Sequence, residues 1–399
     1  MPASEAVILR AVTLPPAYVG EIAPCDFFDG NGNLLLREGV LVSENIQKKL
    51  SSRRLFCDAK NTSGILNVDP LLTLAEVGKA LSTLDAQAEA GIDSKFKAET
   101  CNELAGQVYS SWQMDPDACI GFMRVASPGS PSVCQAILAS LFIAELSNSH
   151  AFTRHEAIDL VGAALTMNLG SMALHDEMAE LPGPLPHAFR PLVTRHPGQA
   201  SDILISIGVP DTWSQAVLQH HENLNGSGYP GGLSKGSISL EARMLRLVDV
   251  FAARQRMRRG RGPQYWSLSR ARDLSGLTEQ IFGSDLDSLD ISLARLLMGR
   301  LGLFPPGSII RLSNGEMAII SRRSYDLVRD ATLSPQEAWS FIDAAGQPRT
   351  PSARRIGPRH YRILGYAHDD LPRLPTYDWP ILWGYSSQKR KNGNGRDER

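Results

Sequence analysis

Residues 220–230 read His-His-Glu-Asn-Leu-Asn-Gly-Ser-Gly-Tyr-Pro, and this stretch decides how the chain is interpreted. Two imidazoles stand side by side next to a carboxylate, and a glycine-containing loop follows at once. Neighbouring residues on a helix project about 100° apart, so His220 and His221 can reach adjacent points of one metal site. Glycine lets the backbone approach a ligand closely. The stretch therefore predicts a helix end, a metal-ligating pair and a tight binding loop.

The segments around this stretch have the pattern of helices. Thr153 followed by Glu156 has the spacing of a capping box, with an apolar face behind it. The histidine pair is expected to end a helix over residues 212–221, and the next helix is expected over 240–258. We therefore predict a mainly α protein with an all-helical central domain over residues 115–300.

The flanking segments are predicted to be smaller. Residues 1–65 form a β-rich segment with a hairpin around an Asn-Gly pair, and 66–114 form a helical connector with apolar residues three and four apart. Residues 301–385 are predicted to form a small C-terminal β module, again with an Asn-Gly hairpin. The polar stretch 386–399 is expected to be a disordered tail.

Composition excludes several classes of protein. The net charge of −1 gives no field that would favour a nucleic acid polymer or an acidic membrane. No run of about 18 apolar residues predicts a membrane span, and the N-terminus lacks the pattern of a signal peptide. The five cysteines form no CxxC pair, so reduced thiols are expected. We expect a cytoplasmic protein.

Residues 115–300 resemble the HD-GYP family, the bacterial phosphodiesterases of cyclic di-GMP signalling. The resemblance rests on His196 in an Arg-His-Pro context, on the pair His220 and His221, on the Gly-Ser-Gly-Tyr-Pro loop, and on Asp249 in Leu-Val-Asp-Val-Phe. It implies a helical domain in which histidines, a His-Asp pair and a later aspartate hold two or three metal ions. It also implies hydrolysis of a phosphodiester.

The early part of the family pattern is altered. Where the resemblance places the His-Asp pair, this chain has Met167 and Asn168. Two features fix this register: the Leu-Gly that follows directly, and Pro182, which lies 15 residues after Met167. Pro131 stands in the context of the first histidine, and Ser171 stands where the family has a lysine. The HD pair is therefore degenerate in this interpretation, and no catalytic residue is assigned with certainty.

A literal His-Asp dipeptide occurs at His175-Asp176, eight residues after Met167. Its spacing does not fit the ligand pair. We expect these two residues to lie in a solvated turn after the preceding helix.

The remaining ligands predict at most one metal ion. Two divalent ions 3.5–4 Å apart repel by about 15–20 kcal/mol at an effective dielectric constant of about 20, and a bridging carboxylate normally offsets this. Asn168 carries no charge, and the thioether of Met167 is a soft ligand. His196, His220 and His221 can hold one Fe, Mn or Zn ion, with Asp249 joining or orienting them. Alternatively, these histidines only form hydrogen bonds in a former active site.

The loop and a basic cluster provide further candidate contacts. The loop can bind a guanine base or a phosphate, or it can dock a diguanylate cyclase (GGDEF) domain, as the resemblance implies; a rigid turn is the structural alternative. Arg258 is a candidate phosphate contact, or part of a solvated helix end. The candidate loop residues are Glu222, Gly226, Ser227, Gly228, Tyr229 and Pro230.

Two functional hypotheses follow. The first is a degenerate HD-GYP protein with weak or no phosphodiesterase activity, which senses cyclic di-GMP or docks a partner through the loop. The second is an active metal-dependent cyclic di-GMP phosphodiesterase with a mononuclear or rebuilt site. The sequence leaves a homo-oligomer open.

Overall fold

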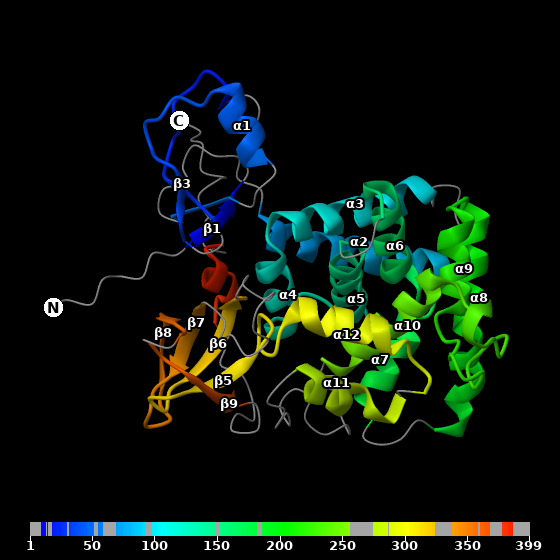
Figure 1. Ribbon diagram of the computed structural model, residues 1–399. Helices are drawn as coiled ribbons and strands as arrows, with labels where there is room; N and C mark the ends of the chain where they lie inside the picture. The colour runs from blue at the N-terminus through cyan, green and yellow to red at the C-terminus, as the bar shows by residue number, and fades with distance from the viewer. Residues whose placement is uncertain are drawn as a thin grey trace, which may run out of the picture.

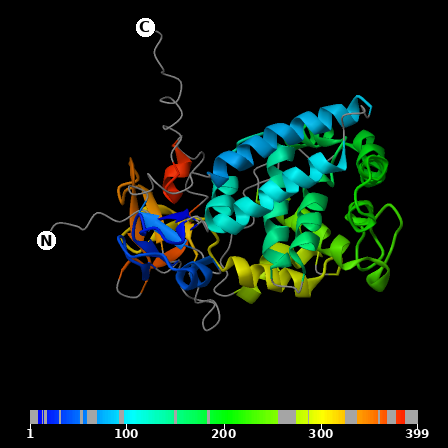
Figure 2. The ribbon, with the colours of Figure 1, turned by 90° about the horizontal axis from the view of Figure 1, so that it is seen from above.

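A computed structural model describes residues 9–12, 14, 18–29, 32–51, 55–58, 69–91, 97–148, 152–181, 186–255, 274–285, 287–323, 337–357, 360–367 and 377–385. A helical domain makes up one side of the molecule, and two small sheets, one from each end of the chain, lie together on the other side (Figure 1, Figure 2). The predicted fold class is confirmed. The predicted tail over 386–399 lies outside the described residues.

The N-terminal sheet is antiparallel, with the strand order β1-β4-β2-β3. Phe27 pairs with Leu36 and Phe28 with Leu34, which confirms the first predicted hairpin. The sheet has a small core of its own around Phe27 and Val42. Its elements are β1 Leu9–Val12, β2 Phe27–Phe28, β3 Leu34–Leu36, α1 Glu44–Ser51 and β4 Leu55–Asp58.

The helical domain begins at α2 and ends at α12. The helices are α2 Pro70–Glu89, α3 Ala98–Met114, α4 Pro116–Val125, α5 Pro131–Ser147, α6 Arg154–Thr166, α7 Met172–Glu180, α8 Arg190–Ile207, α9 Asp211–Gln219, α10 Leu240–Arg254, α11 Leu274–Phe282 and α12 Ile291–Leu301. Short 3₁₀ turns occur at His187–Phe189, Lys235–Ser237, Gly283–Asp285 and Trp379–Trp383.

Helix α5 is the central helix of the domain, because it is apolar on all sides and packs against helices on several faces. Helix α6 begins with the predicted capping box: Thr153 accepts from the amide of Glu156, and the Glu156 carboxylate accepts in return. Helices α2 and α3 pack on α5 and α6 within the same apolar core. The segment predicted as a connector thus contributes to the central core.

The C-terminal sheet is also antiparallel, with the order β8-β7-β6-β5-β9. Ile309 pairs with Ile319 and Ile310 with Ala318, which confirms the second predicted hairpin. Glu337 is the first residue of the third strand of this module. The strands are β5 Ile309–Leu312, β6 Met317–Arg322, β7 Glu337–Ile342, β8 Pro348–Arg355 and β9 Ile363–Tyr366.

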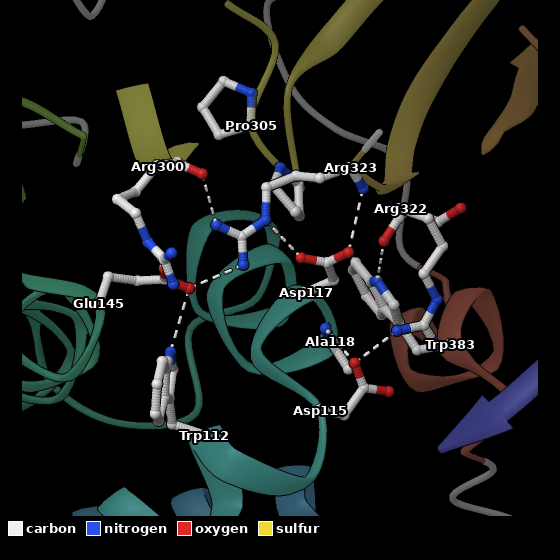
Figure 3. A network of polar contacts seen from close by, with 12 residues as sticks. Trp112, Asp115, Asp117, Ala118, Glu145, Arg300, Pro305, Arg322, Arg323 and Trp383 are labelled. Carbon is white, nitrogen blue, oxygen red and sulfur yellow. Dashed lines mark hydrogen bonds and ion pairs between the residues drawn. The ribbon is translucent and has the colours of Figure 1, made fainter. Parts of the chain in front are cut away.

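A buried ionic network attaches this sheet to the helical domain (Figure 3). At the end of β6, Arg323 donates to Asp117 at 2.6 Å and to Glu145 at 2.7 Å. The neighbouring Arg322 pairs with Asp115. Burial disfavours the charged form of Asp117, but Arg323 and Arg322 outweigh it and hold the pKa of this carboxyl below its usual value. Sheet and helices are therefore joined by paired charges as well as by apolar contacts.

Helices α8 and α9 lie at the end of the helical domain away from both sheets (Figure 1). Within the described part of the chain, none of the helices has the length and apolar character needed to span a bilayer.

Candidate metal centre and adjoining loop

His196 lies inside α8, and the proline that follows it shapes its environment. Pro197 has no N–H group, so the carbonyl of Val193, four residues earlier, lacks its usual helical donor. Nδ1 of His196 lies 2.6 Å from this carbonyl oxygen. A carbonyl only accepts, so Nδ1 carries the proton and Nε2 presents a lone pair in the neutral ring. Residues 195–197 lie within α8, with Pro197 inside the helix.

His220 follows the last residue of α9, where backbone carbonyls lack helical partners. Its Nδ1 lies 2.6 Å from the carbonyl oxygen of Val217, which fixes the same tautomer as in His196. Helix α9 is positioned by Trp213, which packs against α6 where Gly162 leaves room: a Cβ on Gly162 would lie 2.0 Å from the indole ring. The indole N–H donates to Thr166 at 2.9 Å.

The two Nε2 atoms of His196 and His220 face each other at 3.2 Å. Both side chains are fully buried. Burial, followed by the charges of His220 and His175, lowers the pKa of His196 to about 2, and burial also lowers the pKa of His220. Two neutral rings therefore direct their lone pairs at the same point. Such an arrangement is stabilised by a cation between the nitrogens.

His221 completes the group whose ligand atoms lie within 4.8 Å of one another. The structure thus brings together the three histidines predicted from the sequence. Its Nδ1 lies 3.1 Å from Nη1 of Arg246, and its ring stacks on Tyr229 with centroids 4.8 Å apart. Burial, with smaller contributions from His220 and His196, lowers the pKa of His221 well below its usual value.

His175 is where the sequence-based expectation was wrong. It does not lie in a solvated turn; it lies on α7, partly buried, with its ring 4.9 Å from that of His196. Asp176 on the same helix accepts a 2.7 Å hydrogen bond from the backbone N–H of Ser132 at the start of α5. The apolar face of α7 turns this segment onto the domain, which dipeptide spacing did not reveal.

Met167 and Asn168 lie in the turn between α6 and α7. Met167 is fully buried in the apolar core, and Asn168 is 3% exposed. Among the described residues, the Asn168 Oδ1 atom has no hydrogen-bond partner. The turn is held from α2 by Asp85, which accepts from the amide of Gly170 at 2.6 Å. A neutral amide and a buried thioether thus occupy the positions at which the resemblance expects a His-Asp pair.

Asp249 on α10 is buried but is not among the atoms that converge within 4.8 Å in the described chain. Its Oδ1 accepts a 2.8 Å hydrogen bond from the side-chain amide of Gln135 on α5. Sequence reasoning missed Gln135. It lies one helical turn after Pro131 and on the same face, a spacing that could have identified it.

The loop after the histidine pair is organised by Glu222. This buried carboxylate accepts from the amides of Gly231 at 2.6 Å and Leu233 at 2.8 Å. Gly228 packs directly on the backbone of residues 221–223, because a Cβ there would lie 2.4 Å from the amide nitrogen of Asn223. Gly226 has a φ of +78°, and Ser227 and Pro230 are exposed. Arg258 lies outside the described residues.

Residues 129–274 match the model of the HD domain family. The cyclic di-GMP phosphodiesterase PA4108 of Pseudomonas aeruginosa is 26% identical over 243 residues, which cover 59% of this chain and 54% of the relative. The 3'3'-cGAMP-specific phosphodiesterase 3 of Vibrio cholerae is 30% identical over 118 residues, which cover 30% of this chain and 25% of the relative.

A third relative is the cyclic di-GMP phosphodiesterase response regulator RpfG of Xanthomonas campestris pv. campestris. It is 36% identical over 95 residues, which cover 23% of this chain and 25% of the relative. The chain thus spans about half the length of the first of these relatives and a quarter of the other two. The helical core of this chain therefore matches the HD domain family over residues 129–274, and its similarity to cyclic di-GMP phosphodiesterases supports an assignment to the HD-GYP family.

Proposed function

We propose that the chain is a cyclic di-GMP signalling protein that binds the dinucleotide beside one metal ion and hydrolyses it weakly or not at all. The observation that carries the proposal is the pair of Nε2 lone pairs of His196 and His220, directed at each other across 3.2 Å. The names of the relatives supply the substrate class.

The donor set fits one divalent ion. Metal–imidazole bonds of about 2.0–2.1 Å allow one ion to reach two nitrogens at this separation. Both rings are neutral and already carry their proton on Nδ1, so no proton has to be displaced from Nε2. The hydrogen bonds to Val193 and Val217 are the outer contacts that orient metal-bound histidines. Fe, Mn or Zn suits this nitrogen-rich site.

A second ion is not part of the proposal. Met167 points into the apolar core and Asn168 supplies no charge, so this turn offers no bridging carboxylate. Asp249 is hydrogen bonded to Gln135. A bound ion supplies a Lewis acid that lowers the pKa of a water molecule, and paired ions stabilise both the attacking and the leaving oxygen of a phosphodiester. We therefore expect one ion to support weaker catalysis than a pair of ions.

The loop is proposed as the part of the site that meets the nucleotide or a partner. Tyr229 stacks on His221, and burial raises the pKa of its phenol, so the hydroxyl stays protonated and can donate to a phosphate. The exposed Ser227 and Pro230 offer an outer surface for a GGDEF domain or for a second copy of the chain. A cytoplasmic location is part of the same proposal, since that compartment contains the dinucleotide.

An active phosphodiesterase with a single ion is the alternative, and the same pair of histidines favours it. The two candidates differ in turnover. The first test combines metal analysis of protein purified without oxygen, calorimetric titration with cyclic di-GMP, and chromatography of the products. We expect one ion per chain, binding of the nucleotide, and little or no product.

A His220→Ala variant is expected to lose the ion, and Glu222→Ala is expected to keep the ion while its affinity for the nucleotide falls about tenfold through the loosened loop. His155→Ala is the matched control, because this side chain is 83% exposed and is not one of the candidate site residues. Rapid turnover that His220→Ala abolishes would establish the enzyme instead. Absence of both ion and nucleotide binding would contradict the proposal.

A further inference from the structure

A one-ion site on His196 and His220 needs a third protein ligand, as such sites normally have three. Two more histidine rings border the pair. The ring of His221 lies 4.9 Å from that of His196 at an interplanar angle of 87°, and the ring of His175 lies 4.9 Å from it at 88°. The two rings flank His196 with the same geometry, but their surroundings differ.

The contact with Arg246 determines which nitrogen of His221 carries the proton. A guanidinium has only donors and keeps its charge, so the 3.1 Å contact with Nη1 makes Nδ1 of His221 an acceptor. The proton of the neutral ring then lies on Nε2, and a protonated nitrogen does not ligate a metal. Arg246 is fixed by a second hydrogen bond, 3.2 Å to Oδ1 of Asn223, and Tyr229 stacks on the histidine ring.

His175 lies on α7, and hydrogen bonds to two other helices hold α7 in place. Asp85 of α2 accepts from the amides of Gly170 and Met172 at the start of α7, and Asp176 binds the first turn of α5. The Nε2 atom of His175 is screened from solvent. In the present conformation the group within 4.8 Å consists of His196, His220 and His221, so ligation by His175 requires its side chain to rotate toward His196.

We infer that His175 is the third imidazole of the one-ion site and that Arg246 keeps His221 out of it. This inference rests on the proposed function, since it presupposes an ion on His196 and His220. The third ligand would then come from α7. This helix follows Met167 and Asn168, the two positions at which the family's His-Asp ligand pair is replaced. The ligand set is then His175, His196 and His220.

The test is a titration of the metal-free full chain with Co²⁺, followed by its visible absorption and by competition with a chelator. Phenylalanine keeps a planar ring without nitrogens, so His175→Phe and His221→Phe form a matched pair. We expect His175→Phe to weaken Co²⁺ affinity by at least tenfold and to change the absorption spectrum, and His221→Phe to change affinity less than threefold. Thermal unfolding checks the fold, and His175→Gln or His221→Gln replaces the corresponding phenylalanine variant if that variant does not fold.

A second comparison tests the role of Arg246. Arg246→Met releases Nδ1 of His221, so the ring can present a lone pair to the ion. In the His175→Phe background, Arg246→Met is therefore expected to restore most of the lost Co²⁺ affinity. If it restores none, Arg246 does not govern the ligand choice and that half of the inference is overturned.

The outcomes separate this inference from the proposed function. If His175→Phe binds Co²⁺ normally and His221→Phe does not, His221 and not His175 is the third ligand. Equal losses in the two variants likewise overturn the inference that His175 takes the place of His221. Either result leaves the one-ion proposal standing. A wild-type chain that binds no Co²⁺ overturns both. Loss confined to His175→Phe, with rescue by Arg246→Met, establishes the ligand set.

Discussion

The side-chain amide of Gln135 donates a buried hydrogen bond of 2.8 Å to the carboxylate of Asp249. The two residues are 114 positions apart in the chain and lie on α5 and α10. This bond gives a buried charge a neutral partner close to the histidine cluster, where Asp249 also acts on the charge state of His220. The hydrogen bond from Gln135 thus stabilises the Asp249 carboxylate.

Replacement of Gln135 by leucine tests this relationship. Without metal, we expect the free energy of unfolding to fall by about 2 kcal/mol, because a buried carboxylate loses a hydrogen bond. With a saturating divalent ion the loss should be smaller, since the cation compensates the charge of Asp249. Urea unfolding with and without Zn²⁺ measures both values. Gln199→Leu, on the exposed face of α8, is the control, and equal losses in both conditions would show that Asp249 does not sense the ion.

Asp85 predicts a pH dependence of stability. Burial raises the pKa of this carboxyl to about 6, although the amides of Gly170 and Met172 oppose the shift. An aspartate with a raised pKa binds its proton more tightly in the folded state, so its contribution to stability is present at low pH and is lost as the pH rises through 6. From pH 5 to pH 7.5 the loss is about 1.4 kcal/mol.

Asp85→Asn removes this titration while keeping an acceptor for the two amides. Measured by urea unfolding, the variant should gain about 1.4 kcal/mol relative to the wild type between pH 5 and pH 7.5. A difference between variant and wild type that is the same at both pH values would refute a raised pKa at this position.

Gly162 predicts a link between packing and metal binding. Alanine there would clash with the ring of Trp213, which positions α9 and, at its end, His220. We expect Gly162→Ala to cost about 1–3 kcal/mol of stability and to weaken metal affinity about tenfold. Gly106→Ala is the control, because no described atom lies within 4 Å of the added Cβ. Unchanged affinity in a destabilised Gly162→Ala would mean that His220 keeps its place without Trp213.

The elements that the sequence predicted correctly depend on residues close to one another in the chain. The capping box spans Thr153 to Glu156, and the two Asn-Gly hairpins join adjacent strands. The three histidines were brought together in the prediction by a family pattern with known spacing. The strand order of the N-terminal sheet was not predicted, because β4 enters between β1 and β2 from a distant position.

The contacts that sequence reasoning missed join distant segments. Gln135 meets Asp249, and the ring of His175 meets that of His196 only because α7 and α8 pack in one domain. No local pattern marks such pairs. The role of Pro197 was missed for another reason: a proline usually suggests a helix boundary, whereas here it frees a carbonyl for His196 inside α8.

The ionic network between the sheet and the helices gives the last prediction. Arg323 is 6% exposed and compensates two buried carboxylates, Asp117 and Glu145. Arg323→Met leaves these charges with fewer partners, and breaking a buried pair in this way costs about 3–5 kcal/mol. The loss should appear in urea unfolding of the full chain as a lower midpoint, and the β-sheet signal should be lost first because the network attaches the sheet.

Arg349→Met is the matched control for this variant. Arg349 pairs with Glu316, but its side chain is 36% exposed and Glu316 keeps a second partner in Arg354. Exposed pairs contribute about 0–1 kcal/mol, so this variant should stay close to the wild type. Comparable losses in the two variants would mean that burial does not set the value of these ion pairs, and that apolar contacts alone hold the sheet to the helical domain.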